Sequence, residues 1–197
     1  KAIENIEAAE NDEEAPFVYG ILGWVHLIKG NFELVLALKD KMLSKMERQI
    51  HPDSYNGICA ASWAASALGR WDEAEEIATE AARTAQEFSD KSNLAFSEGF
   101  LVIAYVLQGK VDQAVEEAQR VLERISTPAY EVWGRGILAW AWCRAGEPTK
   151  AVEVLRSVVE ACRVANHVPS QIYFTLFLVE ACFLDEQYQN ARQTGES

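Results

Sequence analysis

The stretch Gly109-Lys-Val-Asp-Gln-Ala114 combines a glycine, which favours the end of a helix, with a small residue five positions later. Similar six-residue stretches lie at Gly30–Val35, Gly69–Ala74, Gly146–Ala151 and Glu186–Ala191. Successive copies are 39, 40, 37 and 40 residues apart. A nearly constant period of this size predicts a solenoid, in which each repeat is one supersecondary unit stacked on the next.

Each period of the sequence predicts two helices. Within residues 111–125, apolar side chains recur at i, i+3, i+4 and i+7, which places them on one helix face, and residues 71–88 repeat this pattern. These segments are the expected second helices of two pairs. The first helices are expected at about residues 16–28, 53–68, 91–107, 128–145 and 169–184. Each turn glycine then falls just past a first helix, where a left-handed C-cap needs a residue without Cβ. The predicted fold class is all-α.

The composition limits the partners and the compartment. The chain has 197 residues, 49% hydrophobic and 24% charged, and a formal net charge of −12. Because nucleic acids and anionic membrane surfaces attract basic patches, neither is expected as a partner. No apolar stretch reaches the length of a membrane span. The four cysteines lie in apolar helical stretches without a Cys-x-x-Cys pair, which favours free thiols in a reducing, cytoplasmic compartment.

The turn stretches carry a family resemblance. A small residue lies seven positions before the turn glycine at Gly23, Ser62 and Ala139, and an aromatic residue lies four positions before it in two copies. Together with Gly-x-x-x-x-Ala, this pattern resembles the tetratricopeptide repeat (TPR). The sequence departs from the family in its period, which is 37–40 residues instead of about 34, and in Val102 at one small position. The resemblance implies a right-handed superhelical solenoid of antiparallel helix pairs.

The resemblance also divides the chain. Residues 12–193 are expected to form five TPR-like pairs, at about 16–50, 53–89, 91–126, 128–167 and 169–193. Residues 1–11 are amphipathic and are expected to be the end of a preceding repeat helix in a larger protein. The segment Thr127–Arg192 is further similar to the helical arrays that follow an ATPase module in bacterial cyclase-type and LuxR-type signalling proteins.

In TPR proteins the first helices line the concave face, and the family pattern assigns two residues of each helix, seven positions apart, to this groove. The predicted groove residues are Phe17, Trp24, Asn56, Trp63, Phe96, Ile103, Trp133, Trp140, Tyr173 and Glu180, with Arg144 as a further charged group beside them. Seven of the ten paired positions are aromatic, although aromatic residues make up only 10% of the chain. Such rings offer a large apolar contact area at low entropic cost.

Three arrangements of these rings are compatible with the sequence. They can line an open groove, they can belong to the core between first and second helices, or a tightly wound superhelix can pack them against each other. Between the two residues of each pair lie Gly20, Cys59, Gly99, Gly136 and Leu176. Four of these residues are small, and we expect them to leave hollows between neighbouring rings.

Motifs that would indicate catalysis or a cofactor are missing from the sequence. His26, His51 and His167 fall in different repeats, and no clustered histidine or cysteine pattern offers a metal site. The sequence contains neither a P-loop nor a dinucleotide-binding motif. Acidic residues gather on the second helices, within 72–80 and 112–123, which is typical of solvated outer faces. We therefore expect a protein that is not an enzyme and that uses no metal or cofactor.

The function favoured by these observations is recognition. We expect a scaffold that binds a protein or peptide segment, apolar or rich in aromatic residues, in the concave groove. An alternative is a regulatory domain that senses a small molecule within a larger bacterial signalling protein. A third hypothesis is a structural stack whose ends mediate self-association, which predicts apolar patches on the terminal helices.

Overall fold

The computed structural model describes residues 15–46, 54–87, 89–125 and 127–196, and within these ranges it contains ten helices and no strand. The first helices of the pairs, called A helices, are α2 (Ala15–Ile28), α4 (Ser54–Ala67), α6 (Lys91–Leu107), α8 (Pro128–Arg144) and α10 (Val168–Leu184). The second helices, called B helices, are α3 (Phe32–Met46), α5 (Trp71–Glu87), α7 (Val111–Arg124), α9 (Pro148–Val164) and α11 (Tyr188–Glu196). The prediction that residues 1–11 end a preceding helix lies outside the described residues.

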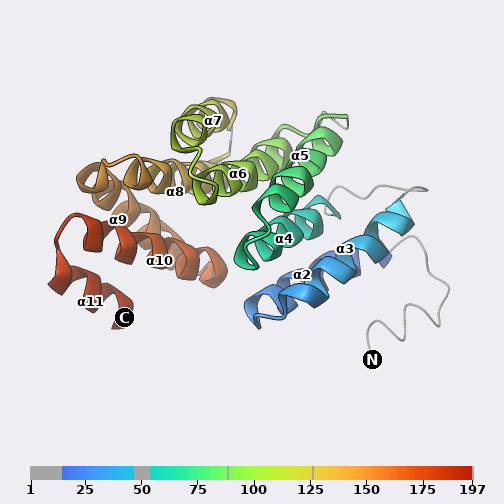
Figure 1. Cartoon of the computed structure of the whole chain (residues 1–197), viewed down its shortest axis with the longest axis horizontal. Helices are drawn as coiled ribbons and strands as arrows, with labels where there is room; N and C mark the ends of the chain where they lie inside the picture. The colour runs from blue at the N-terminus through green and yellow to red at the C-terminus, as the bar shows by residue number, and fades with distance from the viewer. Residues whose placement is uncertain (1–14, 47–53, 88, 126, 197) are drawn as a thin grey trace.

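The helices stack in two layers. Every helix packs on the next one in the chain, and each A helix also packs on the following A helix. No two B helices of the described residues approach each other in this way, so the A helices form a continuous inner wall and the B helices stand outside it. Figure 1 shows the resulting curved path, with α2 and α3 at one end and α10 and α11 at the other. The predicted all-α solenoid of helix pairs is confirmed.

The five A-to-B turns share one geometry. Gly109 has a φ of 77°, which lets the amide of Lys110 donate to the Tyr105 carbonyl at 2.9 Å and close the end of α6. The equivalent bonds are Asn31 to His26 at 2.9 Å, Arg70 to Ala65 at 2.9 Å, Glu147 to Trp142 at 2.9 Å and Gln187 to Cys182 at 2.8 Å. The last turn keeps this form although Glu186, with a φ of 60°, replaces the glycine.

The residue five positions after each turn fixes the B helix against its A helix. Four of these anchors are fully or nearly fully buried, namely Val35, Ala74, Ala114 and Ala151, and Ala191 in the short last helix is 8% exposed. In the second pair the Ser62 hydroxyl donates to the Ala74 carbonyl at 2.9 Å. A small side chain is needed here because the two helix backbones approach closely at the start of each B helix.

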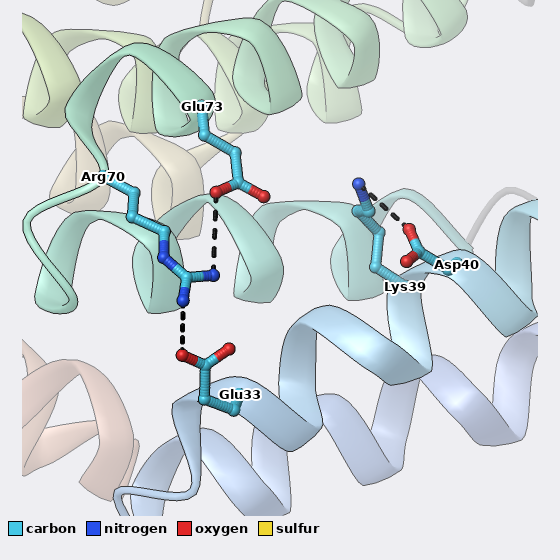
Figure 2. Close-up of polar contacts among 5 residues, drawn as sticks. All are labelled: Glu33, Lys39, Asp40, Arg70 and Glu73. Atoms are coloured by element: carbon cyan, nitrogen blue, oxygen red, sulfur yellow. Dashed lines mark hydrogen bonds and ion pairs between the residues drawn. The ribbon is translucent and has the colours of Figure 1, made fainter.

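Polar contacts join successive pairs on the outer side. Arg70, in the turn between α4 and α5, forms an ion pair with Glu33 on α3 and lies 3.8 Å from a Glu73 carboxylate oxygen (Figure 2). The residue in the equivalent place of the next turn, Lys110, pairs with Glu75 on α5 at 2.8 Å. Exposed pairs of this kind contribute at most about 1 kcal/mol each, so packing of the inner wall carries most of the stability.

The outer face is acidic, with one correction to the prediction. Most acidic residues of α5 and α7 are exposed or half-buried, but Glu117 is only 7% exposed and pairs with Arg120 at 2.5 Å. Glu98 on α6 is also 7% exposed, and Arg124 on α7 donates to it. Burial raises the pKa of Glu98 in spite of that bond. Among the described residues, no helix combines the length and the apolarity that a membrane crossing requires.

Candidate functional site

Aromatic side chains of the A helices form a connected cluster on the inner wall. Phe96 and Phe100, one turn apart on α6, both pack on Trp133 of α8, with ring centroids 5.1 and 5.2 Å from it. Trp133 in turn meets Phe174 of α10 at 5.5 Å. Trp24 of α2 reaches Phe100 at 6.1 Å, so rings from α2 to α10 form one network.

This network closes across the concave side of the array. Trp63 on α4 lies 4.4 Å from Tyr173 and 6.3 Å from Phe177, both on α10. Trp140 on α8 stacks on the same Phe177 at 4.3 Å with an interplanar angle of 5°. The second pair therefore touches the fifth through side chains alone. Of the three arrangements open to the sequence, the structure has the one in which the superhelix packs its rings against each other.

The predicted groove residues differ in exposure. Ile103, Trp133 and Trp140 are buried, Trp24, Trp63, Phe96, Tyr173 and Glu180 are half-buried, and Phe17 and Arg144 are exposed. The side chain of Asn56 lies outside the described residues. The inner wall thus brings most of these side chains together, but as a packed surface instead of a continuous open groove.

Of the four small residues between the rings, Gly20 lines a cavity as expected, whereas Cys59, Gly99 and Gly136 leave no hollow. A Cβ at Gly99 would lie 2.5 Å from Trp133 Nε1, and a Cβ at Gly136 would overlap the Phe174 ring. The Cys59 thiol contacts the Ser97 hydroxyl at 3.5 Å. Gly20 lies against Gly57 in the same manner. At four positions, Gly20, Cys59, Gly99 and Gly136, the A helix packs closely against the next A helix. We call these residues seat positions.

One cavity remains beside the ring cluster. It has a volume of about 800 Å³ and lies between α2 and α10, with walls from α6, α8 and the end of α9. Five predicted groove residues line it, namely Phe17, Trp24, Phe96, Trp133 and Tyr173. Its apolar wall is completed by Gly20, Ile21, Ile28, Tyr130, Val132, Ala161, Cys162, Ala165, Pro169 and Phe174. A volume of this size is typical of sites that enclose a compact ligand.

Few polar groups reach this cavity. His167 caps α10 by accepting the Ser170 amide on Nδ1 at 3.4 Å, and both residues line the rim. The Tyr173 ring is half-buried, and desolvation raises the pKa of its hydroxyl, which therefore stays protonated at neutral pH. The cavity thus offers aromatic surface with a few hydrogen-bonding groups for orientation, and no fixed charge among its described lining residues.

Arg144 and Glu180 lie outside the cavity and bind each other. Arg144 donates to Glu180 Oε1 at 2.6 Å, and Trp140 Nε1 donates to Glu180 Oε2 at 2.8 Å. Glu180 therefore accepts a hydrogen bond on each carboxylate oxygen. The bond from Trp140 holds the indole ring in its position over Phe177. The two charged groups expected at the groove therefore strengthen its closure.

The four thiols of the chain are not reactive groups. All four cysteines are free and buried. Burial raises the pKa of Cys59 to about 12 and the pKa of Cys143 to about 11, so both remain protonated at neutral pH. In the part of the chain that the structure describes, no group of three histidine, cysteine or carboxylate side chains could hold a metal ion.

Sequence reasoning missed several ring residues. Phe100, Phe174 and Phe177 complete the cluster, although none of them was predicted to face the groove. A signal existed, because Phe100 and Phe177 each follow a predicted groove residue by four positions and therefore extend the same helix face. The contribution of α9 to the cavity had no such signal, since B helices were expected to stay outside.

Comparison with known proteins supports the fold. No protein-family model and no curated protein matches the chain. A solved structure of nearly identical TPR-like repeats, from a kinesin light chain of Podosopora anserina, is 21% identical and has a TM-score of 0.57, with 92% of this chain and 93% of that chain covered. A single-substitution variant of it gives 21% identity, a TM-score of 0.59 and 93% coverage of both chains. At this identity the similarity concerns the fold alone: the chain adopts the TPR-like repeat fold.

Proposed function

We propose that this protein is a non-enzymatic interaction scaffold that binds an apolar or aromatic-rich segment of a partner protein in the cavity between α2 and α10. The observation that carries the proposal is the cavity itself, because its walls come from four of the five pairs and are mainly aromatic and aliphatic. A segment inserted there would contact both ends of the array at once.

The size of the cavity limits what it accepts. Its volume of about 800 Å³ holds a few large side chains but no long extended chain. Burial of one leucine or phenylalanine side chain contributes about 1.5–3 kcal/mol. Two or three such anchors from a short turn of the partner would therefore give moderate affinity, after the cost of ordering the segment is subtracted.

A second candidate function is the sensing of a small amphipathic molecule by a regulatory domain of a bacterial signalling protein. The observation that favours it is the closed inner wall, since Trp63 and Tyr173 pack together where an extended peptide would have to pass. A half-open aromatic cavity with a few polar lining groups suits a compact ligand. For either function a cytoplasmic location is proposed, and the four buried free thiols support it.

Titrations with two kinds of probe test these functions. Blocked hexapeptides containing two aromatic residues, and the same peptides with serine in their place, represent a protein segment; the dye 1-anilinonaphthalene-8-sulfonate represents a small amphipathic molecule. Binding is followed by calorimetry and by tryptophan emission, because Trp24 and Trp133 line the cavity. Binding of the aromatic peptides alone supports the scaffold, whereas binding of the dye alone supports the sensor.

A charge placed in the cavity wall shows where the probe binds. Ile21 lines the cavity and is 47% exposed, so Ile21→Glu should leave the fold intact and weaken binding at least tenfold, because the carboxylate is desolvated by the guest. Leu34→Glu is the matched control, since Leu34 is 43% exposed on α3 and does not line this cavity. Equal affinity of the Ile21→Glu variant and the unchanged protein would contradict the proposed site.

A further inference from the structure

The last A helix carries an apolar face that the described part of the chain leaves largely exposed; at its C-terminal end the Phe183 ring meets Tyr188 of α11, with ring centroids 5.5 Å apart. Val168, Ile172, Leu176 and Phe183 on α10 are 52%, 51%, 60% and 60% exposed. They lie on one side of the helix, together with the half-buried Val179, because their spacings of four, four, three and four residues follow the helical repeat. We call this set the α10 face. Large exposed apolar patches on one element indicate an interaction surface.

The centre of the same side is covered in every earlier A helix. Leu176 stands where the four seat positions stand in α2, α4, α6 and α8, and each of those is buried under the next A helix. The four earlier seats, Gly20, Cys59, Gly99 and Gly136, are all small residues. Small seats admit a helix at close range, whereas Leu176 would hold a helix of the same repeat type away. The α10 face therefore presents bulkier side chains than the earlier seats.

The pattern of the α10 face is symmetric about its centre. Leu176 is the middle residue of Val168–Leu184, with Ile172 and Val168 on one side of it and Val179 and Phe183 on the other, at similar distances. An antiparallel helix with the same sequence would thus match apolar residues with apolar residues along its whole length. Such self-complementarity is what a twofold contact between identical chains requires.

The charge of the protein does not oppose this contact. The chain carries a net charge of −12, which would repel a second copy on most surfaces. Glu180 is the only charged residue between Val168 and Leu184, and its carboxylate is held by Arg144 and Trp140 on the inner side. The α10 face is therefore a neutral strip on an acidic molecule, and two neutral strips can meet without burying an unpaired charge.

We propose that the protein forms a homodimer in which the α10 faces of two copies pack antiparallel about a twofold axis at Leu176. The contact is separate from the cavity, because none of Val168, Ile172, Leu176 and Phe183 lines it. In this arrangement Leu176 of one copy meets Leu176 of the other, and Val168 of each copy lies near Phe183 of the other.

Sedimentation velocity over a range of protein concentrations tests the proposal. We expect the mass to rise from the chain mass of 22.0 kDa to twice that value and to stay there. Leu176→Glu should give monomers at all concentrations, with unchanged helicity, because two carboxylates would face each other at the axis. Leu34→Glu, the same change on α3, should still dimerise. A wild-type protein that stays monomeric, or one whose mass keeps growing, overturns the proposal; continued growth would indicate end-to-end stacking.

A pair of complementary variants tests the twofold axis directly. Leu176→Glu and Leu176→Lys should each be monomeric, and an equimolar mixture should form a heterodimer, because opposite charges then meet at the axis. In a contact where residue 176 meets a different residue, mixing restores nothing. Leu176→Cys should likewise give an intermolecular disulfide under mild oxidation, whereas Leu34→Cys should not; the native thiols are buried and give little background. Failure of both the mixing and the disulfide results would exclude the twofold contact.

Discussion

At the scale of single residues, the A-to-B turns need glycine for its backbone conformation and not for its small size. Gly30, Gly69, Gly109 and Gly146 all have φ between 74° and 87°, and Glu186 adopts 60° at the fifth turn. A Cβ at Gly109 would meet no atom within 4 Å, so its requirement is conformational and not steric. A left-handed conformation costs a non-glycine residue roughly 1–2 kcal/mol, which Glu186 bears in the structure.

Exchanging the residues at two of these turns should have opposite effects on stability. We expect Gly109→Ala to lower the free energy of unfolding by about 1 kcal/mol and Glu186→Gly to raise it by up to about 1 kcal/mol, because only the second change removes backbone strain. Urea unfolding followed by circular dichroism measures both. A stabilised Gly109→Ala variant would show that the turn does not need a positive φ.

At the scale of helices, the seat positions determine how closely one pair approaches the next. Gly136 is covered by Phe174, a side chain with no exposed surface, and Gly57 on α4 would place a Cβ 2.6 Å from the Gly20 Cα atom. Neither neighbour can move without displacing a whole helix. Glycine inside these helices thus reduces helix propensity but permits tight stacking of the inner wall.

Alanine substitutions at two helical glycines should therefore change the free energy of unfolding in opposite directions. We expect Gly136→Ala to lower the free energy of unfolding by about 1–3 kcal/mol, because the added methyl group overlaps the Phe174 ring. Gly23→Ala should raise it by up to about 1 kcal/mol, since the nearest atoms to its Cβ are 3.8 and 4.0 Å away and the helix gains propensity. Thermal unfolding monitored by calorimetry measures both, and two effects of the same sign would contradict the seat role of Gly136.

Most of the fold could be predicted from the sequence because its determinants are local. The turn period located each A-to-B junction, and helix periodicity located both helices of a pair. The seat positions were recognised as small residues, but the expected hollow is present only at Gly20. From sequence alone, a small residue between two rings looks the same whether it borders a hollow or packs against a neighbouring helix. Glu117 was wrongly expected to be solvated for a similar reason, because the periodicity of a helix does not determine how the helix tilts against its neighbours.

At the scale of the whole molecule, the curvature of the array decides the form of the site. Trp63 and Tyr173 are far apart in the sequence, and their contact depends on the small rotation between successive pairs, added over the three steps from the second pair to the fifth. No motif encodes that sum. The sequence therefore predicted some of the rings that face inward but left open whether they meet, and it indicated a hollow at Gly20 without showing that α10 forms its opposite wall.

Removal of the ring that spans the array should open it. We expect Trp63→Ala to lower the free energy of unfolding by about 2–3 kcal/mol, which is less than for a fully buried tryptophan because Trp63 is half-buried. The same change should increase the radius of gyration. Small-angle X-ray scattering measures the second effect. Trp71→Ala is the control, since Trp71 is 45% exposed on α5 and lies away from the ring cluster. An unchanged radius in the Trp63→Ala variant would mean that stacking of the pairs alone fixes the curvature.

The contact between α4 and α10 also changes how the molecule comes apart. In a stack where each unit touches only its neighbours, the terminal unit frays first, because its loss breaks a single interface. Here the detachment of α10 and α11 also separates Tyr173 and Phe177 from Trp63. Slow amide hydrogen exchange should consequently extend into α10, and the array should unfold in one cooperative step instead of unzipping from its C-terminal end.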